Sequence, residues 1–116
     1  MSQQSIALLT LTRTAAGAIA ANRFVTPLGA QAGVDANVLG VSRVAAAAAG
    51  EKIPVDVIGT TTVEAGAAIA EGATLESDAT GRAITWATAG GRVGIALEAA
   101  SAAGEFIEIL LISNAA

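Results

Sequence analysis

The 116-residue chain has very few side chains that could carry out chemistry. It has no His and no Cys, so it lacks the usual general base near neutral pH, a thiol nucleophile, and both imidazole and thiolate metal ligands. A Ser–Lys pair would have to use Lys52, the single lysine, which follows Gly50-Glu51 and is more simply explained as a solvated strand edge. We therefore expect no catalytic residues, no metal site and no cofactor.

No short motif indicates a bound nucleotide or calcium ion. Gly90-Gly91 belongs to neither a Gly-x-x-x-x-Gly-Lys-Ser/Thr nor a Gly-x-Gly-x-x-Gly pattern, and no Asp-x-Asp-x-Asp-Gly loop occurs. The single tryptophan, Trp86, is the remaining candidate for a binding residue. A lone Trp is more often a core residue, but Trp is also enriched in binding hot spots, so both roles stay open.

Charge and composition narrow the class of protein. The net charge is −4, and the six basic residues are scattered, which argues against a nucleic-acid groove. No apolar stretch approaches the roughly 18 residues of a membrane helix, and the N-terminus has no signal-peptide pattern, so we expect a soluble protein without export. The chain has 30 Ala, two Phe and no Tyr. Because Ala contributes little buried area, at roughly 25 cal/mol per Å², burial against partners or copies of the chain is plausible.

The elements that would position any functional residue come from an internal repeat. Residues 40–58 align with residues 94–112 at a shift of 54, and nine of the nineteen positions are identical. The identical pairs other than Ala are Gly40/Gly94, Gly50/Gly104, Glu51/Glu105, Ile53/Ile107 and Ile58/Ile112. Each copy is typical of a short strand, a small-residue connection and a longer strand. The paired glutamates could face each other across a pseudo-twofold axis or, more simply, end Gly turns.

Strand patterns recur along the rest of the chain. About nine short strands are expected, with a hairpin at Asp78–Gly81 and a single helical turn or tight bend at 44–49. Alternation predicts that Ile53, Val55 and Val57 face inward, as do Ile107, Ile109 and Leu111, with Glu108 facing outward. Pro54 suggests an edge strand or a free N–H side. The expected fold is all-β, a small β-barrel or β-sandwich of two related β units with at most one or two short helical turns.

We expect one β domain at residues 13–116, with the repeat at about 17–59 and 67–113, and an N-terminal arm or strand at residues 1–12. The segment Ser5–Thr12 has apolar residues on both faces. It could be a core strand or an arm that lies against another subunit.

Several segments together resemble a known family. These are Gly72–Ala83 (GATLESDATGRA), Val93–Glu105 (VGIALEAASAAGE), Arg23–Pro27 (RFVTP), Val38–Val41 (VLGV) and Val63–Ala70 (VEAGAAIA). In order and spacing they are similar to tailed-bacteriophage capsid decoration proteins, small cement proteins of the head surface that are often filed as a domain of unknown function. The resemblance covers most of residues 19–113.

This resemblance implies a compact β fold without catalysis, a structural protein of the virion. Such proteins lie on the outer capsid surface, commonly as trimers, and clamp neighbouring major capsid proteins against the pressure of packaged DNA. The expected partners are therefore the major capsid protein and the chain itself, with a trimer favoured, and no nucleic acid or membrane. Strand addition to the capsid protein by an N-terminal segment would place an arm at Ser2–Thr12. The candidate interface residues are Ile6, Leu8, Leu9, Leu11, Phe24 and Trp86.

Two rival functions remain. Biotinyl or lipoyl carrier domains are also built from two related β units, but Lys52 lacks the Glu-Ala-Met-Lys or Asp-Lys-Ala setting of their modified lysine. Another self-assembling shell or tail component is the second alternative.

Overall fold

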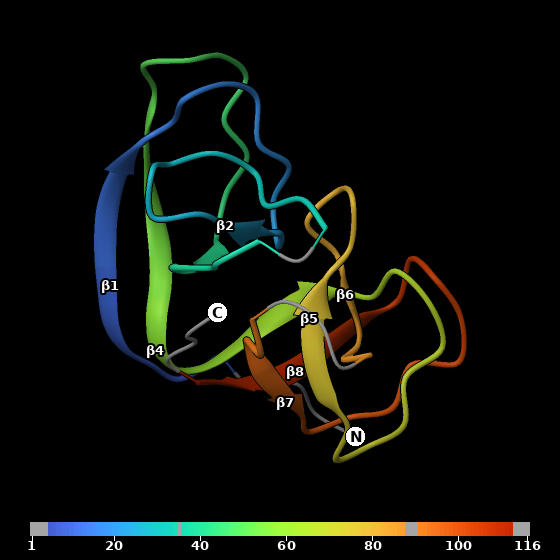
Figure 1. The fold of residues 1–116 in the computed structure, drawn as a ribbon. Helices are drawn as coiled ribbons and strands as arrows, with labels where there is room; N and C mark the ends of the chain where they lie inside the picture. Colours follow the sequence, from blue (N-terminus) through green and yellow to red (C-terminus); the bar gives the residue numbers. More distant parts are fainter. Residues whose placement is uncertain (1–4, 35, 88–90, 113–116) are drawn as a thin grey trace.

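The computed structural model describes residues 5–34, 36–87 and 91–112. Within these ranges the chain forms eight strands and no helix, which confirms the predicted all-β class (Figure 1). The strands are β1 (Ala7–Thr14), β2 (Phe24–Val25), β3 (Gly40–Ser42), β4 (Lys52–Glu64), β5 (Thr74–Ser77), β6 (Ala83–Thr85), β7 (Gly94–Ala96) and β8 (Phe106–Leu111). The Ala-rich run at 44–49 makes bends rather than a helical turn, because six residues between two strands are too few to stabilise a helix. No membrane-spanning helix occurs in the described ranges.

The long strand β4 belongs to both halves of the molecule. Its first half pairs with β1 on one side and β3 on the other, and its second half, from Thr60 to Glu64, pairs with β8. Figure 1 shows β4 running down beside β1 and then turning sharply toward β8. The strand order is β2-β3-β4-β8-β7-β5-β6, with β1 added to β4, and every strand pair is antiparallel. A parallel bridge from Ala65 to Ala83 brings β6 back to the end of β4 and nearly closes the sheet.

The two β units repeat the same backbone hydrogen bonds. In the first unit Ile19 pairs with Ala46, and in the second Ile69 pairs with Ala100. Ala15 N donates to Glu51 O at 2.7 Å, and Ala65 N donates to Glu105 O at the same distance. The repeat therefore matches β1 with the second half of β4, β2 with β5, and β3 with β7. It also matches the first half of β4 with β8. β4 is therefore the last strand of the first unit and the first strand of the second unit.

The buried side chains form two clusters, and the smaller one is reproduced inside the larger. The smaller cluster consists of Ala15, Ile19, Val25, Ala46, Ile53 and Val55. Its six counterparts, Ala65, Ile69, Leu75, Ala100, Ile107 and Ile109, all belong to the larger cluster. The larger cluster also takes in Phe24, Val38 and Val41 from the first unit, so the two units share a core. Ile53 and Ile107 thus occupy equivalent environments.

The strand faces differ from expectation at Glu108. Ile107, Ile109 and Leu111 are buried as predicted, but the expectation that Glu108 faces solvent is wrong, since only 9% of the residue is exposed. The preceding loop is bonded against it: Leu97 N donates to Glu108 O, and Glu108 N donates to the Glu98 carboxylate. Asp56, on the face opposite Ile53 and Val55, is fully buried.

Pro54 lies in a strand that has neighbours on both sides. Its carbonyl accepts from Arg43 N, one residue beyond the end of β3. The N–H and C=O of one residue point to the same side of a strand, so an N–H at position 54 would also point toward the β3 side. The pairing of β3 with β4 ends at Ser42 and Val55, so no ladder hydrogen bond is lost there. Proline is tolerated here for that reason.

Candidate functional site: an exposed edge strand

β1 is the most exposed strand of the sheet. Leu8 is 76% exposed, Ile6 54%, Leu9 41% and Leu11 37%, and no residue of the strand is fully buried. β4 is the one strand with which β1 pairs in the described part of the chain. The outer edge of β1 therefore offers backbone N–H and C=O groups, flanked by leucine side chains, to a further strand.

This edge lacks the usual protection against pairing. Natural edge strands commonly carry Lys, other charged residues, Pro or short length. β1 is eight residues long, has no Pro, and carries no charged side chain before Arg13. The Arg13 guanidinium is directed to the Pro27 carbonyl, to which Nη2 donates at 2.8 Å. An uncharged apolar edge of this kind is typical of a strand that is covered in an assembly.

A buried carboxylate lies beneath the middle of β1. Asp56 accepts a hydrogen bond from Thr10 Oγ1 at 3.0 Å and from Thr61 Oγ1 at 2.9 Å, and its Oδ1 pairs with Arg43 Nε at 2.8 Å. A buried charge is tolerated only when it keeps such partners. Asp56 therefore joins β1, the end of β3 and both sides of the turn in β4.

An apolar groove lies between the two units beside β4. Its volume is about 560 Å³. It is lined by Pro27, Asn37, Val38, Leu39, Val57, Ile58, Leu111 and Ile112. None of these side chains carries a charge, and Ile58 is half exposed. The groove therefore offers uncharged side chains from both units beside β4.

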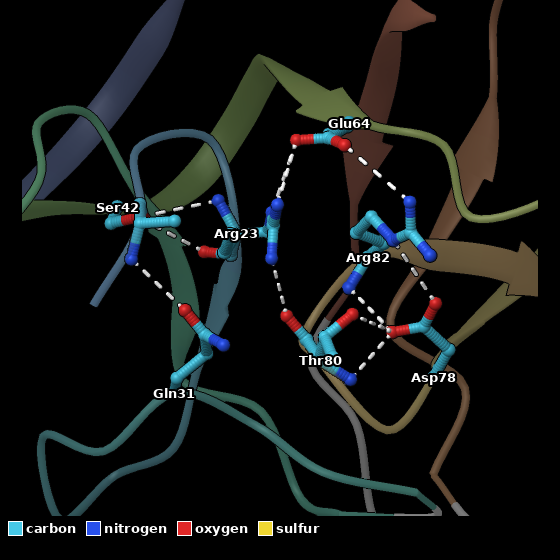
Figure 2. Close-up of polar contacts among 8 residues, drawn as sticks. Arg23, Gln31, Ser42, Glu64, Asp78, Thr80 and Arg82 are labelled. Atoms are coloured by element: carbon cyan, nitrogen blue, oxygen red, sulfur yellow. Dashed lines mark hydrogen bonds and ion pairs between the residues drawn. The ribbon is translucent and has the colours of Figure 1, made fainter. Parts of the chain in front are cut away.

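A polar cluster holds the units together on another side, and Figure 2 shows Arg23 and Arg82 both reaching Glu64. Arg23 pairs with Glu64 through Nη2 at 2.9 Å, and its Nη1 donates to Thr80 O at 2.8 Å. Arg82 lies between Glu64 and Asp78, at 3.6 Å and 3.4 Å. The backbone adds Phe24 N to Gly81 O at 2.8 Å. We call Arg23, Glu64, Asp78 and Arg82 the interunit clasp; its charges are mutually neutralised and leave no obvious site for a ligand.

The repeated glutamates each close their own loop. Glu51 accepts from the amides of Ala47 and Ala48, and Glu105 accepts from the amide and hydroxyl of Ser101. The Ser101 hydroxyl, followed by its amide, lowers the pKa of Glu105 below the ordinary 4.5. The simpler of the two explanations offered for this pair, that the glutamates end Gly turns, therefore agrees with their contacts.

The sequence-predicted interface residues are placed in three different settings. Ile6, Leu8, Leu9 and Leu11 lie together on or beside β1. Phe24 is fully buried in the larger core cluster, so it has no surface to offer a partner. Trp86 follows β6 in the second unit and is partly buried, with the Arg92 guanidinium 4.7 Å from its ring centroid. β6 does not pair with β1, so Trp86 is not part of the β1 edge.

Sequence reasoning missed the buried Asp56 cluster and the exposure of Ile58. The Asp56 cluster gave no signal, because Thr10, Arg43 and Thr61 are far apart in the chain and unremarkable by type. Ile58 was noted only as a repeat position, and its exposure depends on the turn that follows it in β4. Among the described residues, no group of His, Cys, Asp and Glu could hold a metal ion. Lys52 is exposed, and its Nζ donates to Thr14 Oγ1 at 3.1 Å.

The fold and this edge define a small all-β protein with an exposed outer strand. The family model described as phage cement protein matches residues 3–111, so the chain belongs to the phage cement protein family, whose members are structural proteins of phage capsids. The fold is shared with the head fiber gp8.5 N base in bacteriophage phi29, with a TM-score of 0.72, 17% identity, and coverage of 90% of this chain and 94% of that one. None of the curated proteins matches this chain in sequence.

Proposed function

We propose that this protein is a non-enzymatic decoration protein that binds the outer surface of the phage head and stabilises contacts between major capsid proteins. Membership of the cement family supports a place on the capsid. The single observation that carries the mode of binding is β1, a strand with a free edge, exposed leucines and no charged side chain before Arg13. We infer that a strand of the capsid protein adds to this edge, so that backbone hydrogen bonds supply affinity and the leucines supply specificity.

Cement of this kind needs neither a pocket nor a cofactor. Many modest contacts, repeated over a symmetric shell, add up to strong overall binding. The protein would be made in the host cytoplasm and would act on the assembled head. A homo-oligomer, with a trimer favoured, fits a chain whose Ala-rich core leaves large apolar residues exposed. Light scattering on the purified protein tests this, with a mass three times 11.3 kDa as the expected result.

Binding to undecorated, expanded heads tests the function directly. The purified protein should bind such heads and raise their resistance to heat. Leu11→Lys should weaken binding by about tenfold or more, because a charge on the edge opposes strand pairing. Leu97→Lys is the matched control, since Leu97 is 36% exposed against 37% for Leu11 but lies in the second unit, outside β1. If both variants keep the parent's stability and bind heads equally well, β1 is not part of the interface.

The alternative functions are decided by separate measurements. The chain could serve in another shell or tail structure, or as the base of a head fibre like the phi29 protein with which it shares its fold. Electron microscopy of labelled virions distinguishes head surface, fibre and tail. A carrier domain would gain a prosthetic group on Lys52, which the intact mass of protein from infected cells would reveal.

A further inference from the structure

The hydrophobic pattern of β1 does not set its own register on β4. Register is strongly specified only where one face of a strand is buried. Leu8, Leu9 and Leu11 all remain substantially exposed. Around these three leucines a slip by one residue would change little buried area, yet it would turn the leucines and threonines to opposite faces. The far end of the strand is held separately by the buried Ala15, whose N–H donates to Glu51 O.

The observed ladder already contains two irregularities. From Thr14 to Thr10 the strand pairs regularly with Lys52 to Asp56. Leu9 then pairs with Ile58, which leaves out one residue of β4, and Ala7 pairs with Gly59, which leaves out one residue of β1. The two irregularities cancel. Thr10 is thus the last residue of the regular segment, and it faces Asp56.

The side chain of Asp56 distinguishes the observed register from a slipped one. It is fully buried, and within the described part of the chain Thr10 is the β1 residue whose hydroxyl donates to it. After a slip by one residue, Leu9 or Leu11 would face this carboxylate in place of a hydroxyl. The buried charge would then lose a donor and meet an apolar side chain, which is strongly unfavourable. A single buried polar group is known to select register in this way when apolar packing is indifferent.

We propose that Asp56 is the positioning residue of β1: through Thr10 it opposes a slip by one residue and so decides which side chains each face of the exposed strand presents. That these side chains meet the capsid rests on the proposed function. Arg43 and Thr61 keep the carboxylate in place from the other elements. Arg43 and Thr61 therefore affect β1 through the position of Asp56, and they are not themselves proposed to touch the capsid protein.

Thr10→Val, with Thr12→Val as its matched control, tests the register in the free protein. Both are exposed threonines of β1, but Thr10 is the one that donates to Asp56. By NMR, Thr10→Val should lose the cross-strand contacts between Leu11 and Val55, and its β1 amides should exchange about tenfold faster or more, while β8 amides keep their protection. Thr12→Val should resemble the parent, and Thr10→Ser, which keeps the hydroxyl, should restore the native contacts.

A slip by two residues would bring Thr12 opposite Asp56. The double variant Thr10→Val/Thr12→Val removes that escape and should leave β1 detached or mixed in register. Native register and protection in both Thr10→Val and the double variant would overturn the inference, whatever the heads do. Head binding is read separately: full binding by a variant whose β1 has slipped would count against β1 as the docking strand while leaving the role of Asp56 in register intact.

Discussion

At the scale of single residues, the paired positions of the repeat have physical reasons that differ from one pair to the next. Gly40 and Gly94 lie where a short strand approaches a carbonyl closely: a Cβ would be 2.0 Å from Asp56 O in the first case and 2.8 Å from Leu110 O in the second. Glu51 and Glu105 instead bond the amides of their own loops. The glycine pair is thus explained by close backbone packing, and the glutamate pair by loop closure.

The Glu105 loop has a pH dependence whose sign follows from its hydrogen bonds. Because Ser101 lowers the pKa of Glu105 in the folded protein, the ionised form is favoured there. The contribution to loop order is present above about pH 4.5 and is lost as the pH falls below it. NMR titration of the Glu105 carboxyl should show the lowered pKa, and Ser101→Ala should move it back toward 4.5. Identical titration curves for the two proteins would contradict this.

At the scale of elements, β4 connects the two units, because it belongs to both and turns between them. The turn is at Gly59, whose φ is +111° and where a Cβ would be 2.2 Å from Ile6 O, a carbonyl next to β1. Thr61, beyond the turn, reaches back to Asp56 before it. One strand can serve two units only because its backbone is held in this conformation.

Gly59→Ala should therefore destabilise the protein more than Gly50→Ala. Gly50 also has a positive φ, of 93°, but has open space around it, so its substitution carries the conformational cost alone. The steric conflict at Gly59 should add about 1–3 kcal/mol to the loss in free energy of unfolding. Chemical denaturation measures both values. Equal losses would show that β1 moves aside without cost.

The arrangement of β1 also shows where sequence patterns reach their limit. Ser5–Thr12 was expected to be a core strand or an arm against another subunit. The structure pairs β1 with β4 of the same chain and leaves both faces largely exposed. The assignment of residues 1–12 as an arm separate from a domain at 13–116 stays a prediction, although β1 extends across that boundary to Thr14.

At the scale of the whole molecule, the units are joined by a shared core and by the interunit clasp. Arg23 makes the shorter contacts, with Nε and Nη2 both bonded to Glu64 and Nη1 bonded to Thr80 O. Arg82 pairs with the same carboxylate at a longer distance. The clasp is mostly shielded from water, so its ion pairs are screened less than those at an open surface.

Arg23→Gln should lower the free energy of unfolding by about 1–3 kcal/mol, because it leaves Glu64 partly buried with its weaker partner. Arg82→Gln, which removes the longer contacts, should cost less. Denaturation of both variants, together with Glu64→Gln and the Arg23→Gln/Glu64→Gln double variant, measures the coupling between Arg23 and Glu64. A larger loss for Arg82→Gln would mean that the contact to Asp78, rather than to Glu64, holds the units together.

The amino-acid sequence by itself determined the class of fold, the related units and the inward faces of Ile53, Ile107 and their neighbours, because these follow from local periodicity and from a repeat that can be aligned. It also excluded imidazole and thiol chemistry through the absence of His and Cys. Only the tertiary structure decided that Phe24 belongs to the core, that Asp56 is buried beneath Thr10, and that Arg23 meets Glu64. Each of these depends on segments 41 or more residues apart, or on the turn of β4, and no local pattern specifies which distant side chains a closing sheet brings together.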